Sequence, residues 1–159
     1  TINIPAGATI ANAGTATGFG GTMGPAFQAS LSSTQSITQN TRVKINFDTE
    51  LFDSDSKYDN SSNYRFTPAT AGKYFLYTNA RFIGSDDFDN FQLSIRKNGS
   101  DILFVNRKHH HYGSQMVSGI VDANTTDYFE VFIYQDTGGA LSVYGDADKT
   151  YFGGYKIIL

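Results

Sequence analysis

Alternating apolar and polar residues recur along the chain from Pro25 onward, and this period of two predicts β-strands. In the segments 27–31, 43–47, 91–96 and 128–134, every second residue is apolar or aromatic, so each segment would turn one face toward a core. No long stretch has the 3.6-residue apolar period of a helix. The pattern therefore predicts an all-β chain.

Glycine-containing dipeptides separate some of these segments. Asn98-Gly99 stands between two alternating runs and predicts a type I′ hairpin, because both central residues of that turn need a positive φ. Gly138-Gly139 is expected to turn a second hairpin in the same way. About ten short strands with no helical crossover imply antiparallel pairing, and hence a sandwich or a jelly roll.

Two of the predicted strands carry aromatic residues on both faces. In the segment 72–77, Tyr74 and Leu76 share one face, whereas Phe75 and Tyr77 share the other. A single core covers only one face of a strand, so we expect the second face to be buried against another subunit. The alternative is that isolated rings remain in contact with water. The second such strand has these outward aromatic residues: Tyr128, Phe132 and Tyr134.

Composition limits the class of protein. The 159 residues suit one domain with its own core, and the absence of Cys excludes disulfides, thiol nucleophiles and thiolate zinc sites. A net charge of -3 argues against nucleic-acid binding through the release of counterions. No run of about twenty apolar residues suits membrane insertion, and the start lacks the pattern of a signal peptide.

The first 24 residues differ from the rest of the chain. They hold mostly Thr, Ile, Ala, Asn and Gly, and the first charged residue is Arg42. Segment 1–24 has too few large apolar residues for a core, and its glycines lack the three-residue period of collagen. We expect it to be an extended arm that lies against another surface, or else a flexible leader, with residues 25–159 as the domain. The apolar residues expected to dock the arm are Ile2, Ile4 and Ile10.

A series of aromatic residues follows a characteristic spacing. Phe47 is followed after five residues by Asp53, and after four more by Tyr58. Phe66 comes next, and a Gly-x-Tyr motif begins at Gly72 after five further residues. In this order and near these gaps, the residues resemble the signature of the globular head of complement C1q. That family shares its jelly roll with the tumour necrosis factor ligands.

Both ends of the domain extend this resemblance. Ala26-Phe27-Gln28-Ala29 is similar to the first strand of the family, and Phe152-Gly153-Gly154-Tyr155 is similar to its closing strand. The resemblance implies a ten-stranded antiparallel jelly-roll sandwich that assembles as a homotrimer. It implies a binding or structural head rather than an enzyme. The aromatic residues expected at the trimer interface are Tyr64, Phe75, Tyr77, Tyr128, Phe132, Tyr134 and Tyr151.

Three consecutive histidines form a candidate metal site. On a strand, His109 and His111 would share one face and could bind one divalent metal together. The neighbouring Arg107 and Lys108 disfavour a cation, so a polar surface strand is the alternative.

An acidic loop after Gly84 is a second candidate. Its oxygen donors are closely spaced, as Ca²⁺ prefers, and calcium sites are known in the family that the chain resembles. A solvated loop is the alternative, and we expect no other cofactor. The candidate Ca²⁺ ligands are Asp86 and Asp89. The loop is also a candidate recognition surface, together with the segment 107–112, through Asp86, Asp87, Asp89 and Asn90.

No sequence motif of an enzyme is present, since a nucleophile elbow, an HExxH motif and a phosphate loop are all missing. The sequence lacks a collagen stalk and a secretory signal, and related heads occur in the virions of tailed phages. We therefore expect a non-enzymatic structural protein of a virus particle, either a capsid decoration protein or a fibre head, whose arm docks on a capsid or tail scaffold protein. The alternative is an extracellular recognition head that binds a host surface glycan or a receptor.

Overall fold

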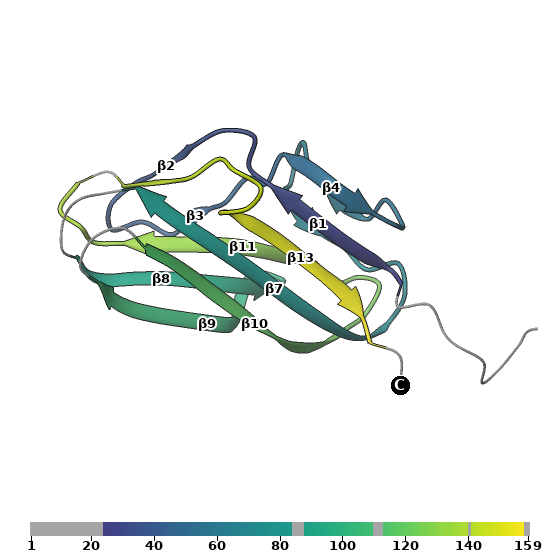
Figure 1. The fold of residues 1–159 in the computed structure, drawn as a ribbon. Coiled ribbons are helices and arrows are strands. Elements are labelled where there is room, and N and C mark those ends of the chain that lie inside the picture. The colour runs from purple at the N-terminus through teal and green to yellow at the C-terminus, as the bar shows by residue number, and fades with distance from the viewer. Residues whose placement is uncertain (1–23, 84–87, 110–112, 140, 158–159) are drawn as a thin grey trace, which may run out of the picture.

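The computed structural model describes residues 24–83, 88–109, 113–139 and 141–157, without the side chains of residues 88, 89 and 109. This part of the chain contains thirteen strands and no helix. The strands form two antiparallel sheets that pack face to face (Figure 1). This arrangement confirms the all-β jelly-roll sandwich. Three of the thirteen strands, β3, β5 and β6, are only two residues long, spanning Val43–Lys44, Tyr58–Asp59 and Arg65–Phe66.

Sheet A contains seven strands and faces the viewer in Figure 1. Its central strand β7 pairs with β10 along one edge and with β12 and β13 along the other. Beyond β13 the order continues to β1 and β4, and β2 pairs with β12. The bounds are β1 (Ala26–Ser30), β2 (Gln35–Ile37), β4 (Thr49–Asp53), β7 (Gly72–Ile83), β10 (Gly113–Ala123), β12 (Leu141–Val143) and β13 (Tyr151–Lys156).

Sheet B contains the other six strands and lies behind sheet A in Figure 1. Its order is β5-β6-β11-β8-β9, and β3 also pairs with β11. The bounds of its longer strands are β8 (Phe88–Lys97), β9 (Ser100–His109) and β11 (Phe129–Gln135).

Aromatic rings from both sheets fill the space between them. Phe27 stacks on Phe66 with ring centroids 4.2 Å apart, and it meets Phe152 edge to face at 5.1 Å. All three side chains are at most 1% exposed. Burying a side chain of this size stabilises a fold by roughly 1.5–3 kcal/mol. The inward residues of the alternating segments therefore make one continuous core.

The two predicted hairpins have different outcomes. Asn98 and Gly99 have φ values of 51° and 82° and connect the paired strands β8 and β9, which confirms the type I′ prediction. The prediction of a hairpin at Gly138-Gly139 is wrong, because β11 pairs within sheet B and β12 pairs within sheet A. The buried amide of Gln135 holds this crossing, since its Nε2 donates to the carbonyl oxygens of Ile37 and Gly139 at 3.0 and 2.9 Å.

An acidic residue joins the confirmed hairpin to the start of β11. The carboxylate of Asp127 accepts hydrogen bonds from the side-chain amide of Asn98 and from the backbone N–H of Asn124, each at 2.7 Å, and Lys97 lies 2.8 Å away. Together the Lys97 ammonium and these donors lower the pKa of Asp127 to about 2. Asp127 is therefore ionised at neutral pH and fixes the end of sheet B.

Candidate functional site: the two outer faces of the sandwich

The outer face of sheet A carries apolar side chains that the core does not cover. Along β7, Tyr74 and Leu76 are fully buried, whereas Phe75 and Tyr77 point outward and are half-buried. The pairing of β7 with β10 and β13 places further apolar residues beside them. We call this surface the aromatic face, and it consists of Phe75, Tyr77, Met116, Ile120, Tyr151 and Tyr155.

Four rings of the aromatic face contact one another. The centroid of Phe75 lies 5.5 Å from that of Tyr155 and 6.1 Å from that of Tyr77. Tyr77 in turn meets Tyr151 edge to face at 6.1 Å. Aromatic pairs at such distances contribute about 0.5–1.5 kcal/mol each beyond the area that they bury. The rings therefore hold each other in place before any partner binds.

A glycine makes room for the central ring. A Cβ atom on Gly153 would lie 2.5 Å from the hydroxyl oxygen of Tyr77 and 2.9 Å from the carbonyl oxygen of Phe27. Because residue 153 has no side chain, Tyr77 lies across β13, and its hydroxyl donates to Oε1 of Gln28 at 2.9 Å. Burial raises the pKa of Tyr77, and Tyr151 and Tyr155 add to the effect. Tyr77 thus remains a neutral hydrogen-bond donor.

Strand β10 adds two exposed aliphatic side chains. Ile120 lies opposite Phe75 in the register and is 61% exposed, and Met116 lies opposite Asn79 and is 53% exposed. Apolar side chains grouped in this way on a sheet are typical of a protein interface. Sequence reasoning missed Met116, Ile120 and Tyr155. The alternation along β10 was present, but Val117 and Val121 made the opposite face look equally apolar.

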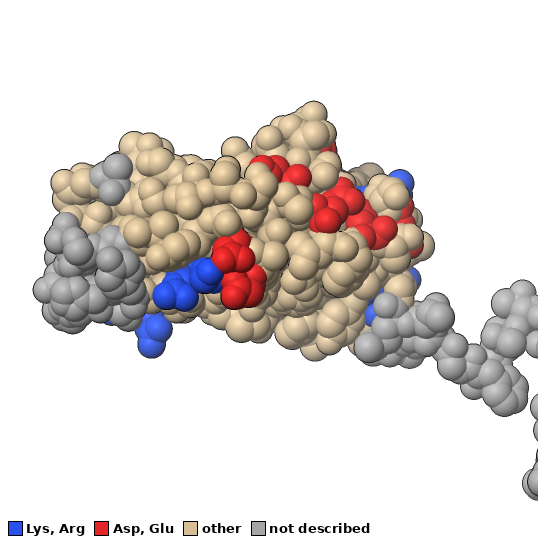
Figure 2. All heavy atoms as spheres, turned by 45° about the horizontal axis from the view of Figure 1, so that its top comes forward, with Lys and Arg blue, Asp and Glu red and all other residues tan. Residues whose placement is uncertain are grey.

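Charged residues stand at the two ends of the aromatic face. Lys73 and Asp122 form an ion pair of 2.7 Å at one end. At the other end, the guanidinium of Arg81 lies 5.2 Å from the ring centroid of Tyr144. In Figure 2, which shows this side of the molecule tilted, a basic and an acidic group touch near the middle of the view, and further acidic side chains gather to the right. An apolar centre with polar ends is the usual anatomy of an interface.

The outer face of sheet B carries the other predicted aromatic residues, and cations cover two of them. The guanidinium of Arg65 lies 4.5 Å from the ring centroid of Tyr128, and that of Arg96 lies 4.7 Å from the centroid of Phe132. Lys44 also lies over the ring of Phe132, at 5.8 Å. These are cation–π distances. Tyr128 and Phe132 therefore have partners within their own chain.

Two of these cations, Lys44 and Arg96, also form ion pairs. Lys44 contacts the nearly buried carboxylate of Glu130 at 2.5 Å. Asp101 forms ion pairs with both Arg42 and Arg96, each at 3.1 Å. These pairs connect β3 with β11 and β8 with β9.

The seven predicted interface residues thus occupy three places. Phe75, Tyr77 and Tyr151 lie together on the aromatic face, and Tyr64 lies beside a polar hollow. The remaining three, Tyr128, Phe132 and Tyr134, lie on the outer face of sheet B. There the hydroxyl of Tyr134 donates to Oδ1 of Asn40 at 3.2 Å.

Most of the other predicted site residues lie outside the described part of the chain. These are Ile2, Ile4 and Ile10 of the arm, Asp86 and Asp87 of the acidic loop, and His111. Asp89 and His109 are described only as backbone, on β8 and β9. Asn90 is described in full, and its backbone and side-chain nitrogens both donate to Asp136 at 2.7 Å, so these two donors serve the fold.

The described residues contain neither a metal-binding cluster nor a membrane-spanning helix. No group of three or more His, Cys, Asp or Glu residues is placed to hold a metal ion there. No helix in that part of the chain is long and apolar enough to span a membrane.

The chain was compared with known proteins. A family model described as the C1q domain matches residues 26–157. A search of curated proteins finds no match.

Solved structures share the fold at low sequence identity. Murine APRIL at pH 5.0 is 13% identical with a TM-score of 0.66, over 83% of this chain and 98% of that one. The globular domain of zebrafish complement 1qA is 15% identical with a TM-score of 0.59, over 84% and 97%. Eiger TNF from S. frugiperda is 12% identical with a TM-score of 0.60, over 84% and 90%.

Proposed function

We propose that this chain, which belongs to the C1q domain family, is a non-enzymatic head that assembles as a homotrimer through its aromatic face. Domains of this family are typically trimeric binding modules rather than enzymes. The observation that carries the proposal is the exposure of Ile120 directly beside the packed rings of Phe75 and Tyr155, and of Met116 further along the same strand.

The energetics favour closing this face against further copies. Removing an exposed Met or Ile side chain from water contributes roughly 1.5–3 kcal/mol, and three copies repeat the gain at each contact. The rings already pack on one another, so little side-chain entropy remains to be lost on assembly. A rotationally symmetric assembly also presents the same apolar surface from every subunit, so none is left uncovered.

Within this class we propose a structural protein of a virus particle, either a capsid decoration protein or a fibre head. A chain without Cys and with no charged residue before Arg42 supports this assignment, because such a neutral arm suits docking on a protein scaffold. Residues 1–24 would add to an exposed sheet edge of a capsid or tail scaffold protein by backbone hydrogen bonding. The protein would then be located in the virion.

The first experiment measures the mass in solution. Light scattering at micromolar concentration should give about 52 kDa, three times the 17.4 kDa of one chain. A monodisperse species of the mass of one chain would refute the trimer. Deletion of residues 1–24 should leave the protein trimeric, with its mass lowered only by the residues removed, because the arm is assigned to docking and not to assembly.

The genes beside the one that encodes this chain test the virion assignment. Capsid and portal genes would support a decoration protein, and tail genes would support a fibre head. A neighbourhood without virion genes would overturn the viral role and leave the trimer proposal intact.

A second candidate function is recognition of a host surface glycan or a receptor, in an extracellular setting. One observation favours it, namely an open polar hollow beside Tyr64, whose lining residues include Ser33, Asn46 and Asp48.

A further inference from the structure

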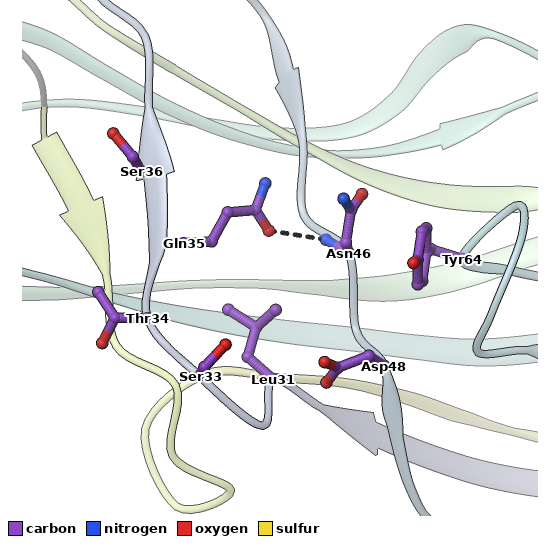
Figure 3. Close-up of a pocket in the computed structure, with 8 residues that line it drawn as sticks. All are labelled: Leu31, Ser33, Thr34, Gln35, Ser36, Asn46, Asp48 and Tyr64. Atoms are coloured by element: carbon purple, nitrogen blue, oxygen red, sulfur yellow. Dashed lines mark hydrogen bonds between the residues drawn. The ribbon is translucent and has the colours of Figure 1, made fainter.

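An open hollow of about 380 Å³ lies where three segments of the chain meet. One side is formed by the turn between β1 and β2 together with β2, another by the segment between β3 and β4, and the third by Tyr64 (Figure 3). Its volume is within the usual range of small-ligand sites. The lining residues are Leu31, Ser33, Thr34, Gln35, Ser36, Asn46, Asp48 and Tyr64.

Hydrogen bonds hold the walls of the hollow in position. The side chain of Gln35 joins two segments, since its Nε2 donates to the carbonyl oxygen of Lys44 at 2.7 Å. Its Oε1 accepts the N–H of Asn46 at 2.9 Å, which is the bond drawn in Figure 3. Asp48 accepts the backbone N–H of Ser32 at 2.7 Å and its hydroxyl at 2.6 Å. A site that is already ordered in the free protein loses little entropy when a ligand binds.

The turn that carries Ser33 is also fixed by close packing. A Cβ atom on Gly145 would lie 2.0 Å from the carbonyl carbon of Ser33, so the loop before β13 contacts this turn directly. The backbone N–H of Gly145 also points to the hydroxyl of Thr34 at 3.5 Å. Two loops distant in sequence therefore support one wall.

Several polar groups of the hollow have no partner within the described residues. These are the side-chain amide of Asn46 and the hydroxyls of Ser33 and Tyr64, for which no hydrogen bond is recorded in that part of the chain. Asp48 also retains acceptor capacity, because its Oδ2 accepts only one hydrogen bond there. The hollow therefore offers both donors and acceptors to a ligand.

The charge of the lining limits which ligand would fit. Partial burial alone would raise the pKa of Asp48, but the hydrogen bonds from the side chain and backbone of Ser32 lower it below its ordinary value. Asp48 is therefore an anion at neutral pH. No Lys, Arg or His lines the hollow. A phosphate, a sulfate or an acidic sugar would meet a like charge without a compensating cation, so a neutral ligand with several hydroxyls is favoured.

An uncommon backbone conformation presents the aromatic wall. Tyr64 has a φ of 50°, which is an outlier for a bulky side chain and is often found at binding sites. The preceding turn holds it there, because Asp59 accepts the N–H groups of Ser61, Ser62 and Asn63, and Lys44 donates to the carbonyl oxygen of Asn63 at 3.0 Å. In Figure 3 the ring of Tyr64 is seen nearly edge-on, with one face turned toward Asn46.

We propose that this hollow binds one neutral sugar ring of a glycan. The apolar face of the sugar would lie against the ring of Tyr64. Its hydroxyls would donate to the carboxylate of Asp48 and exchange hydrogen bonds with the amide of Asn46 and the hydroxyl of Ser33. This inference develops the second candidate function by naming its site and ligand class, and it requires neither the trimer nor the arm.

The test is an NMR titration of the full-length protein with the methyl glycosides of glucose, galactose, mannose and N-acetylglucosamine. A single ring in an open site should bind at millimolar concentration, so each titration extends to about 50 mM. At least one sugar should cause saturable amide shifts that concentrate at residues 32–36, 46–48 and 64. Tyr64→Ala and Asn46→Ala should each weaken that binding by about tenfold or more.

Two matched variants separate recognition from general damage. Tyr64→Phe keeps the ring and should bind within about threefold of the unaltered protein, because stacking outweighs one exposed hydroxyl. Asn106→Ala removes an exposed amide from sheet B and should leave binding unchanged.

Three outcomes would overturn the proposal. They are an absence of saturable shifts with all four sugars, shifts that Tyr64→Ala leaves intact, and equal shifts with inorganic phosphate, which would mark an anion site. Light scattering on the same samples tests the trimer separately from the sugar site. Sugar binding by a monomer would refute only the trimer, and a trimer that binds none of the four sugars would refute only the sugar site.

Discussion

Both outer faces of the sandwich carry rows of aromatic side chains, but they differ in what covers those rings. On sheet B, Arg65, Arg96 and Lys44 lie over the rings of Tyr128 and Phe132, and two of these cations, Arg96 and Lys44, also form ion pairs within the chain. On sheet A the rings of Phe75, Tyr77, Tyr151 and Tyr155 contact one another, and exposed aliphatic side chains lie beside them. Rings that cations of the same chain already cover gain less free energy from burial against another subunit.

The comparison separates two meanings of one sequence pattern. An aromatic residue at an outward strand position either packs against a long cationic side chain of the same subunit or stays exposed until another subunit buries it. The neighbouring strands decide between the two, because β3, β6 and β8 bring Lys44, Arg65 and Arg96 to the rings of sheet B. The residues opposite Phe75 and Tyr77 on β10 are Ile120 and Ser118, which carry no charge.

The largest effect is expected when a charged residue is introduced on one outer face and then, in a second variant, on the other. Ile120→Asp places a carboxylate on the aromatic face, where burial against another subunit would cost several kcal/mol. We expect the mass in light scattering to fall from about 52 kDa to that of the 17.4 kDa chain. Because Ile120 is 61% exposed in the single chain, its fold should persist, as circular dichroism would show.

Phe104→Asp is the matched control on the outer face of sheet B. Phe104 is also a large apolar side chain, 48% exposed, and it lies on β9. This variant should keep the mass of the trimer. If Phe104→Asp dissociates the protein and Ile120→Asp does not, the interface has been assigned to the wrong sheet.

Adding a methyl group beneath the central ring should have the next largest effect. Gly153→Ala would place a Cβ atom 2.5 Å from the hydroxyl oxygen of Tyr77 and 2.9 Å from a backbone oxygen, so the ring and the strand would both have to move. Overpacking of this kind lowers the free energy of unfolding by about 1–3 kcal/mol. Urea denaturation would measure the loss, and light scattering should show weaker assembly.

Gly139→Ala adds the same methyl group at a position with no atom within 4 Å. It should change the free energy of unfolding by less than about 0.5 kcal/mol. Equal losses in the two variants would mean that the packing of Tyr77 over β13 contributes nothing particular to the aromatic face.

The smallest effect is expected when one lysine is replaced on each face, and the two losses in the free energy of unfolding can then be compared. Lys44→Met leaves the carboxylate of Glu130, only 9% exposed, without its cation, so we expect the free energy of unfolding to fall by about 1–2 kcal/mol. Lys73→Met breaks a pair whose Asp122 side chain is 80% exposed, and a loss below about 0.5 kcal/mol is expected. Urea denaturation at neutral pH measures both. A larger loss from Lys73→Met would contradict the view that sheet B satisfies its own charges.

Much of the fold was predictable from local patterns. Alternation placed Tyr74 and Leu76 in the core and Phe75 and Tyr77 outside it, as the burial of these side chains confirms. Asn98-Gly99 predicted its turn because the backbone conformation of those two residues is a local property. The order of aromatic and glycine residues resembled the C1q family, and the match of its family model to residues 26–157 confirms this.

The candidate sites were harder to predict, because each needs segments distant in sequence. The sequence suggested one interface of seven aromatic residues, but their positions fall on two faces and beside a hollow. Gly138-Gly139 has the composition of a hairpin turn, yet the strands on either side belong to different sheets. The hollow brings together Ser33, Asn46 and Tyr64, whose types and spacing alone carry no motif.

The sequence by itself determined where the chain would be extended, which side chains of each strand would share a face, and where the tight β8–β9 turn would form. These follow from the two-residue period of a strand and from the φ values that Asn and Gly tolerate, both of which act over a few residues. Only the tertiary structure decided which exposed rings are covered by Lys and Arg and which are left open. Strand order and register bring those cations to one sheet and not to the other, and that placement depends on the packing of the whole sandwich.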